Sequence, residues 1–144
     1  MKGLVLNGPN LNLLGERDQA IYGVTTLADI ENMIRDTFPD HEFNFLQSNH
    51  EGELVDAIHS ARSGSADALI ANWGGYTHSS VAIHDALELL SIPKVEVHLS
   101  NIHAREEFRE HSITGKAMDG IITGFGADSY LLGVEAAIKL LNRK

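Results

Sequence analysis

Apolar and polar positions along this chain follow two periods that alternate from one end to the other. Short apolar or alternating runs, typical of strands, occupy residues 3–6, 42–47, 68–71, 94–97 and 121–123. Between them, apolar residues recur at helical spacing, which predicts helices over residues 26–38, 51–62, 79–90 and 129–141. Strands that alternate with helices of this length predict a parallel sheet covered on both faces.

Local start and stop signals support this assignment. Thr26 and Asp29 suit a capping arrangement at the start of the helix over 26–38, and Pro39 follows its end. With right-handed crossovers, we expect an α/β, flavodoxin-like doubly wound sandwich whose five-stranded parallel sheet has the order 2-1-3-4-5. No linker or repeat interrupts the pattern, so residues 1–144 are expected to form a single catalytic domain.

Composition removes several classes of function. A net charge of −9 argues against nucleic acid as a partner. No apolar run approaches the length that crosses a bilayer, and the N-terminus enters strand-like sequence at once, so neither a membrane span nor a signal peptide is expected. The chain has no cysteine, which removes thiolate chemistry and favours a cytoplasmic location.

Polar residues collect where the predicted strands end. They follow four of the five strands, at residues 7–22, 47–51, 72–80 and 96–111. In a doubly wound fold the ligand crevice lies beyond the carboxyl ends of the strands. We therefore expect a binding site for a small molecule at this edge.

The first of these segments carries Arg17 five residues before Tyr22, between Gly15 and Gly23. A tyrosine is almost fully protonated at neutral pH, and a nearby guanidinium makes a phenolate available as a base. Glycines at both ends allow such a loop to close over a ligand. The alternative is a surface loop with a solvated arginine and a packing tyrosine.

The fourth strand places Glu96 and His98 on the same side, since they are two residues apart. A carboxylate beside an imidazole orients the ring and favours a proton-donating imidazolium. A purely structural pair is the alternative. A metal site that adds His103 lacks the spacing of catalytic zinc sites, so no metal is predicted.

Further along this segment, Ser100 and the neighbouring backbone amides are candidates to hold a carboxylate. Arg109 is a candidate for a hydroxyl or carboxylate contact, or else a solvated charge. The lysines fall outside the strand-end segments, and Lys94 begins the fourth strand at the opposite edge.

Four motifs together resemble the type II 3-dehydroquinate dehydratases, and the resemblance extends over essentially the whole chain. They are residues 7–15 (NGPNLNLLG), 47–53 (QSNHEGE), 76–80 (YTHSS) and 96–109 (EVHLSNIHAREEFR). The resemblance implies an anti elimination of water from 3-dehydroquinate, which gives 3-dehydroshikimate through an enolate. This step belongs to the shikimate pathway or to quinate catabolism.

The resemblance also implies residue roles. Tyr22 as phenolate removes a C2 proton, and Arg17 on a closing lid keeps it ionised. Asn10 holds a water that stabilises the enolate. His98 protonates the departing C1 hydroxyl, and Glu96 orients His98. None of these roles needs a cofactor, and no lysine is placed for the Schiff-base route of the unrelated type I enzymes.

The implied substrate contacts come from the same edge. The substrate hydroxyls are expected to meet Asn72, His78 and Arg109. The backbone at Leu99 and Ser100, with the serine hydroxyl, is expected to hold the carboxylate. Asp85 resembles a residue that reaches the site from a neighbouring subunit of a dodecamer built from four trimers.

Three positions depart from the family pattern. Gln19 replaces a lid proline, Trp73 stands where proline or alanine is usual, and His84 replaces an arginine. We expect a more mobile lid from the first change. The changes at Trp73 and His84 leave one alternative to an active dehydratase, a catalytically weakened substrate-binding paralogue. The fold alone leaves another, a flavodoxin-like cofactor binder.

Overall fold

The sheet has the predicted order and is parallel throughout. A computed structural model describes residues 1–16 and 18–143 of the chain. Five strands pair in the order β2-β1-β3-β4-β5. Their bounds are β1 Lys2–Asn7, β2 Glu42–Gln47, β3 Ala68–Asn72, β4 Lys94–His98 and β5 Gly120–Thr123. The flavodoxin-like α/β prediction is therefore confirmed.

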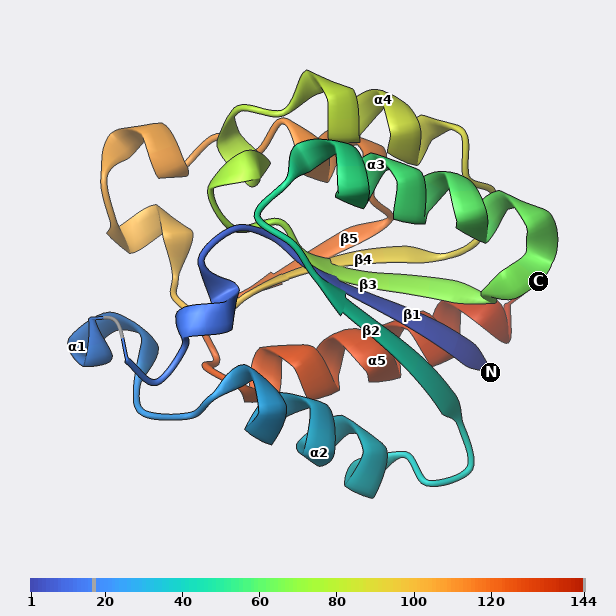
Figure 1. Cartoon of the computed structure of the whole chain (residues 1–144), viewed down its shortest axis with the longest axis horizontal. Helices are drawn as coiled ribbons and strands as arrows, with labels where there is room; N and C mark the ends of the chain where they lie inside the picture. The colour runs from blue at the N-terminus through green and yellow to red at the C-terminus, as the bar shows by residue number, and fades with distance from the viewer. Residues whose placement is uncertain (17, 144) are drawn as a thin grey trace.

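Two pairs of helices cover the two faces of the sheet (Figure 1). On one face lie α2 (Leu27–Thr37) and α5 (Asp128–Leu141), and on the other α3 (Glu51–Ser60) and α4 (Val81–Glu88). A short helix, α1 (Gln19–Tyr22), lies beyond the carboxyl ends of the strands, at the left of Figure 1. Among the described residues, no helix combines the length and apolarity that a membrane crossing requires.

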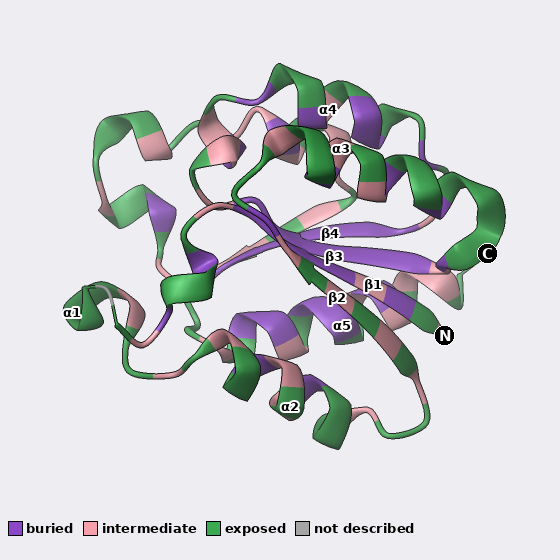
Figure 2. Ribbon diagram, viewed as in Figure 1, coloured by how far each residue is buried: buried purple, intermediate pink, exposed green. Residues whose placement is uncertain are grey.

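Each face of the sheet packs against its helices in a separate core. Successive strand residues point to opposite faces, so Val5 and Ile70 join the α2/α5 side, while Leu6 and Leu69 join the α3/α4 side. β3 and β4 are buried along their whole length, as expected for central strands of a covered parallel sheet (Figure 2).

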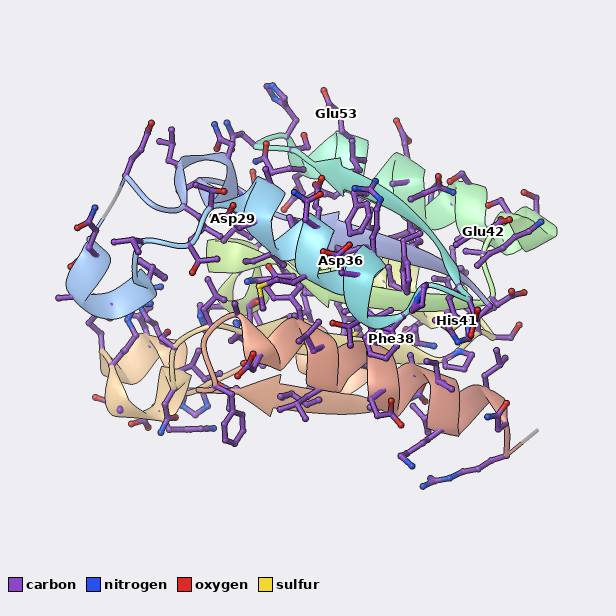
Figure 3. The ribbon with its side chains drawn as sticks, turned by 90° about the horizontal axis from the view of Figure 1, so that it is seen from below. Asp29, Asp36, Phe38, His41, Glu42 and Glu53 are labelled. Atoms are coloured by element: carbon purple, nitrogen blue, oxygen red, sulfur yellow. The ribbon has the colours of Figure 1, made fainter. Side chains whose placement is uncertain are left out.

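Helix α2 begins as its sequence predicts. The Thr26 hydroxyl accepts the Asp29 backbone N–H at 3.1 Å, and the Asp29 carboxylate accepts the Thr26 N–H at 2.9 Å. This backbone hydrogen bond lowers the pKa of Asp29. Asp29 lies at one end of α2, and Phe38 and His41 lie at the other, beside the start of β2 (Figure 3).

Short turns account for the differences from the predicted elements. α3 ends at Ser60 and continues as a wider π turn over Ala61–Ser65, while α4 ends two residues early, at Glu88. α1 and several 3-10 turns, among them Gly74–His78 and Thr114–Ala117, were not predicted. Segments of three to five residues are too short to display a helical period.

The backbone segments that follow β1 and β3 approach each other closely, and this close approach shapes the site. Asn7 and Asn72 are register partners, and the Gly8 N–H donates to the Asn72 carbonyl at 2.7 Å. A Cβ at Gly8 would lie 2.2 Å from the Trp73 carbonyl oxygen, so only glycine fits.

Candidate active site

A cavity of about 130 Å³ lies at the carboxyl ends of the strands, where the sequence predicts it. Predicted site residues make up much of its wall: Asn10, Tyr22, Asn72, His78, His98, Leu99, Ser100 and Arg109. Glu96 lies behind His98. Arg17 is outside the described residues.

His98 and Glu96 form the expected pair on β4. The His98 Nε2 lies 3.0 Å from the Glu96 Oε2, with both side chains buried. A carboxylate accepts, so Nε2 carries the hydrogen, and Nδ1 is the ring nitrogen left for a ligand. The carboxylate thereby fixes both the tautomer and the orientation of the ring.

Two hydroxyls that the sequence analysis missed hold Glu96 in place. Ser112 donates to Oε2 at 3.1 Å, and Thr114 donates to Oε1 through a short hydrogen bond. With His98, the fully buried carboxylate receives three hydrogen bonds, which offset the cost of its desolvation. Both hydroxyls come from an aperiodic segment before β5, where no sequence pattern marks them.

Tyr22 has an arginine partner that the sequence analysis also missed. Arg105 donates from Nη1 to the Tyr22 Oη at 2.9 Å, and its guanidinium carbon lies 5.3 Å from the ring centroid. The same Nη1 is 3.4 Å from the Ser100 Oγ. A charge-assisted bond of this kind stabilises negative charge on the phenol oxygen. The only signal for Arg105 was its place in the segment that contains Ser100.

His78 presents an acceptor to the cavity. Its Nδ1 lies 2.8 Å from the His111 carbonyl oxygen, so Nδ1 carries the hydrogen and Nε2 is free to accept when the ring is neutral. Burial lowers the pKa of His78 from its usual 6.5, and the charges of His98 and Arg109 act in the same direction. The hydrogen bond to His111 opposes them. At neutral pH this side chain is thus an uncharged acceptor.

The loop after β1 is tied to the loop after β2. Asn10 adopts a left-handed backbone conformation, with φ of 70°, and its N–H donates to the Asn49 Oδ1 at 2.9 Å. Gln47 donates to the same Oδ1 and to the Gly8 carbonyl, both at 3.1 Å. Residues 47–51, which the sequence placed at this edge, thus support Asn10.

Beneath the cavity, a buried network joins three elements. The Asn72 Nδ2 donates to the Tyr130 Oη at 3.1 Å, and the Tyr130 hydroxyl donates to the Asn7 Oδ1 at 2.6 Å. Burial raises the pKa of Tyr130, which therefore stays a neutral phenol.

The candidate site residue Asp85 lies away from the cavity of its own chain, and so do Trp73 and Lys94, which the sequence did not assign to the site. Asp85 is exposed on α4, with Oδ1 2.9 Å from the His84 Nδ1. The Trp73 side chain is fully buried in the α3/α4 core rather than in the cavity. Lys94 donates to the Leu90 carbonyl at 2.8 Å, at the amino end of β4.

One group of side chains in the described part of the chain has metal-ligating geometry. His84, Asp85 and Glu88 bring their ligand atoms within 4.8 Å of one another on the surface of α4. Asp85 and Glu88 are exposed, and the group is separate from the cavity. The set of Glu96, His98 and His103 is not such a group; His103 is exposed.

Together, the fold and the cavity define an α/β enzyme. At one edge of its parallel sheet, it has a histidine bonded to a carboxylate and a tyrosine bonded to an arginine. This arrangement suits the removal and return of protons. Comparison with known proteins then shows the family: the chain belongs to the class II dehydroquinases, whose sequence profile matches residues 1–138.

Relatives match nearly the whole length of the chain. It is 54% identical over 132 residues to the 3-dehydroquinate dehydratase of Rhodopseudomonas palustris, a match that covers 90% of this chain and 87% of the relative. It is 53% identical over 140 residues to that of Cellvibrio japonicus, with 96% and 95% covered. The type II dehydroquinase of Butyrivibrio crossotus has a similar crystal structure, with a TM-score of 0.91 and 45% identity, covering 99% of this chain and 97% of that one.

Proposed function

We propose that the residues lining the cavity catalyse the anti elimination of water from 3-dehydroquinate through an enolate. We also propose that residues 1–144 form one catalytic domain. The chain is a hydro-lyase with 3-dehydroquinate dehydratase activity. One observation carries the mechanism: Tyr22, bonded to an arginine, and His98, bonded to a carboxylate, line one cavity. A base and an acid at one site are what an elimination beside a ketone requires.

Tyr22 is the proposed base. Its phenolate takes the C2 proton, and the electrons of the C–H bond move into the enolate. Arg105 supports the proposal, because the hydrogen bond from its Nη1 stabilises negative charge on the Tyr22 oxygen before that oxygen takes the C2 proton. Arg17 is proposed to add a second positive charge from the lid, and Asn10 to hold a water that donates to the enolate oxygen.

His98 is the proposed acid. As the enolate re-forms the ketone, its electrons form the C1–C2 double bond, and the C1–O bond breaks. The proton of the His98 Nδ1 joins the departing oxygen, which leaves as water. Glu96 keeps Nδ1 facing the substrate and balances the positive charge of the imidazolium. The proton taken by Tyr22 returns to solvent, and His98 regains one from it.

The substrate contacts follow from the cavity wall. We assign the substrate hydroxyls to Asn72, His78 and Arg109. The His78 Nε2 accepts a hydroxyl hydrogen, as its tautomer requires. The carboxylate is assigned to the backbone at Leu99 and Ser100 and to the serine hydroxyl.

Assembly and location are part of the proposal. We expect a dodecamer of four trimers in which Asp85 enters the site of a neighbouring subunit, and a cytoplasmic enzyme. The exposed position of Asp85, away from its own cavity, agrees with a role in a second subunit. Light scattering on the purified protein measures the assembly.

The activity is tested by following enone absorbance with 3-dehydroquinate. Tyr22→Phe and His98→Ala are each expected to lower kcat by at least about a hundredfold, with circular dichroism and melting temperature retained. A near-normal rate in either variant contradicts the role of that residue. Inactivation by borohydride in the presence of substrate contradicts the enolate route, since it indicates an imine.

The same assay separates the paralogue alternative. Binding of 3-dehydroquinate without turnover favours a weakened paralogue. The Trp73 change gives this alternative little support, because the Trp73 side chain is buried in the α3/α4 core and does not line the cavity.

A further inference from the structure

We propose that Tyr130, on the buried face of α5, is a positioning residue that orients the Asn72 amide toward the substrate. The inference rests on the proposed function, because it takes Asn72 as a contact for a substrate oxygen. Tyr130 does not line the cavity and touches no substrate. Its hydroxyl acts through Asn72, which does line the cavity.

The side chains of Asn7 and Asn72, at the ends of two neighbouring strands, both hydrogen-bond the Tyr130 hydroxyl. Asn7 ends β1 and Asn72 ends β3, and the two are register partners in neighbouring parallel strands. The Tyr130 Oη lies 2.6 Å from the Asn7 Oδ1 and 3.1 Å from the Asn72 Nδ2. All three side chains are buried, so these hydrogen bonds form away from competing water.

One backbone group sets the direction of the whole chain of hydrogen bonds. The Gly74 N–H, which can only donate, lies 3.1 Å from the Asn72 Oδ1. The oxygen of the Asn72 amide therefore faces Gly74, and its nitrogen faces Tyr130. The Tyr130 oxygen then accepts from Asn72, and its hydrogen is given to Asn7.

The reverse direction leaves a donor facing a donor. If the Tyr130 hydroxyl gave its hydrogen to Asn72 instead of Asn7, the Asn72 oxygen would have to turn toward it. The amide nitrogen would then face the Gly74 N–H. Only one orientation of the Asn72 amide satisfies both Gly74 and Tyr130, and it leaves the second N–H of Asn72 as a donor without a partner among the described residues. Asn72 therefore recognises a substrate oxygen as an acceptor.

Tyr130→Phe removes the hydroxyl and keeps the ring that packs in the α2/α5 core. Without the hydroxyl, the Asn72 nitrogen loses its acceptor, and the N–H of Gly74 is the one described group that still holds the amide. One hydrogen bond of ordinary strength corresponds to a fall in kcat/KM of about three- to tenfold, expressed mainly as a rise in KM.

The test is a double-mutant cycle in kcat/KM for 3-dehydroquinate between Tyr130→Phe and Asn72→Ala. We expect Tyr130→Phe to lower kcat/KM in the wild-type background and to have no further effect on it in the Asn72→Ala background. Equal losses in the two backgrounds overturn the proposal. So does an Asn72→Ala variant with wild-type kcat/KM.

A matched control separates positioning from stability. Ser129, the neighbour of Tyr130 on α5, is also fully buried, and its hydroxyl accepts the Phe125 N–H at 3.0 Å. Ser129→Ala is expected to lower the melting temperature and leave KM within about twofold, because this bond does not lead to Asn72. A KM rise in Ser129→Ala equal to that in Tyr130→Phe overturns the proposal.

A second variant covers the case in which Tyr130→Phe does not fold. Asn7→Ala removes the acceptor of the Tyr130 hydrogen and is expected to raise KM in the same direction by a smaller factor. Unchanged KM in folded Asn7→Ala counts against the network. A wild-type protein that does not turn over 3-dehydroquinate overturns the dehydratase assignment and this inference together, whereas activity without coupling overturns the inference alone.

Discussion

At the scale of single residues, each reactive side chain of the cavity has a partner that determines where its proton lies. Glu96 holds the hydrogen on the Nε2 of His98, and the His111 carbonyl holds it on the Nδ1 of His78. The two histidines therefore differ in their proposed roles: His98 is the proposed proton donor, and His78 is the proposed hydrogen-bond acceptor.

The contact between Arg105 and Tyr22 leads to a first prediction. Arg105→Lys keeps the positive charge but replaces a planar group of several donors with a compact ammonium. A hydrogen bond to a charged group is worth about 1.5–3 kcal/mol, so kcat is expected to fall about ten- to hundredfold. Steady-state kinetics of the enone assay measures it.

Arg62 supplies the matched control for this change. It is exposed on the turn after α3, away from the cavity, and Arg62→Lys is expected to retain wild-type kcat. If Arg105→Lys also retains it, the guanidinium has no role in preparing the base.

His78 leads to a prediction about pH. Its pKa is lower in the folded protein than the ordinary 6.5, so below that pH the unfolded chain binds more protons than the folded one. Stability attributable to His78 is complete above pH 6.5 and declines as the pH falls toward the lowered pKa. Urea unfolding from pH 7.5 to pH 5 is expected to show a smaller decline in His78→Gln than in the wild type.

An NMR titration of the His78 ring provides the direct measurement. The expected midpoint lies below 6.5, the usual value. A midpoint at or above that value would mean that burial does not determine the pKa of this side chain.

At the scale of secondary-structure elements, the site depends on how closely the ends of β1 and β3 approach. Gly8→Ala places a Cβ 2.2 Å from the Trp73 carbonyl oxygen, a contact that no side-chain rotation relieves. The backbone must shift, so we expect a loss of about 2 kcal/mol or more in the free energy of unfolding. Activity should fall together with stability, since the same close approach of the two backbone segments positions Asn72.

Gly52 provides the control on α3. A Cβ there would have no atom of the described residues within 4 Å, and helix propensity favours alanine over glycine by about 1 kcal/mol. Urea denaturation is therefore expected to show Gly52→Ala at least as stable as the wild type. Equal stability of Gly8→Ala and the wild type would contradict the close approach of Gly8 to the Trp73 backbone.

Elements with a clear period were predictable, and elements without one were not. The capping pair Thr26 and Asp29 and the strand over 42–47 agree with the sequence prediction, since hydrophobic spacing and caps are local. Likewise, the cavity lies at the predicted edge, because parallel strands bring their carboxyl ends together.

The supporting residues depend on tertiary placement that a linear pattern does not contain. Thr114 reaches Glu96 from an aperiodic loop, and Arg105 reaches Tyr22 across 83 residues. Tyr130 has the spacing of an ordinary core residue of α5, and nothing in that spacing distinguishes a hydroxyl that bonds Asn72.

At the scale of the whole molecule, the proposed assembly places Asp85 in the site of a neighbouring subunit. It is bonded to His84 on the outer surface of α4 and does not line the cavity of its own chain. If it completes the site of a neighbouring subunit, Tyr22→Phe and Asp85→Ala damage the same site from two different chains. Each variant alone then has no intact site.

Mixed assemblies of these two variants are expected to regain activity, because some sites combine a wild-type Tyr22 from one chain with a wild-type Asp85 from the next. Co-expression with different affinity tags and tandem purification isolates the mixed species for the enone assay. A pair of Tyr22→Phe and His98→Ala serves as the control. Both residues belong to one chain's cavity, so every site of that assembly keeps one defect. Activity in the control pair alone, or in neither pair, would place Asp85 outside the shared site.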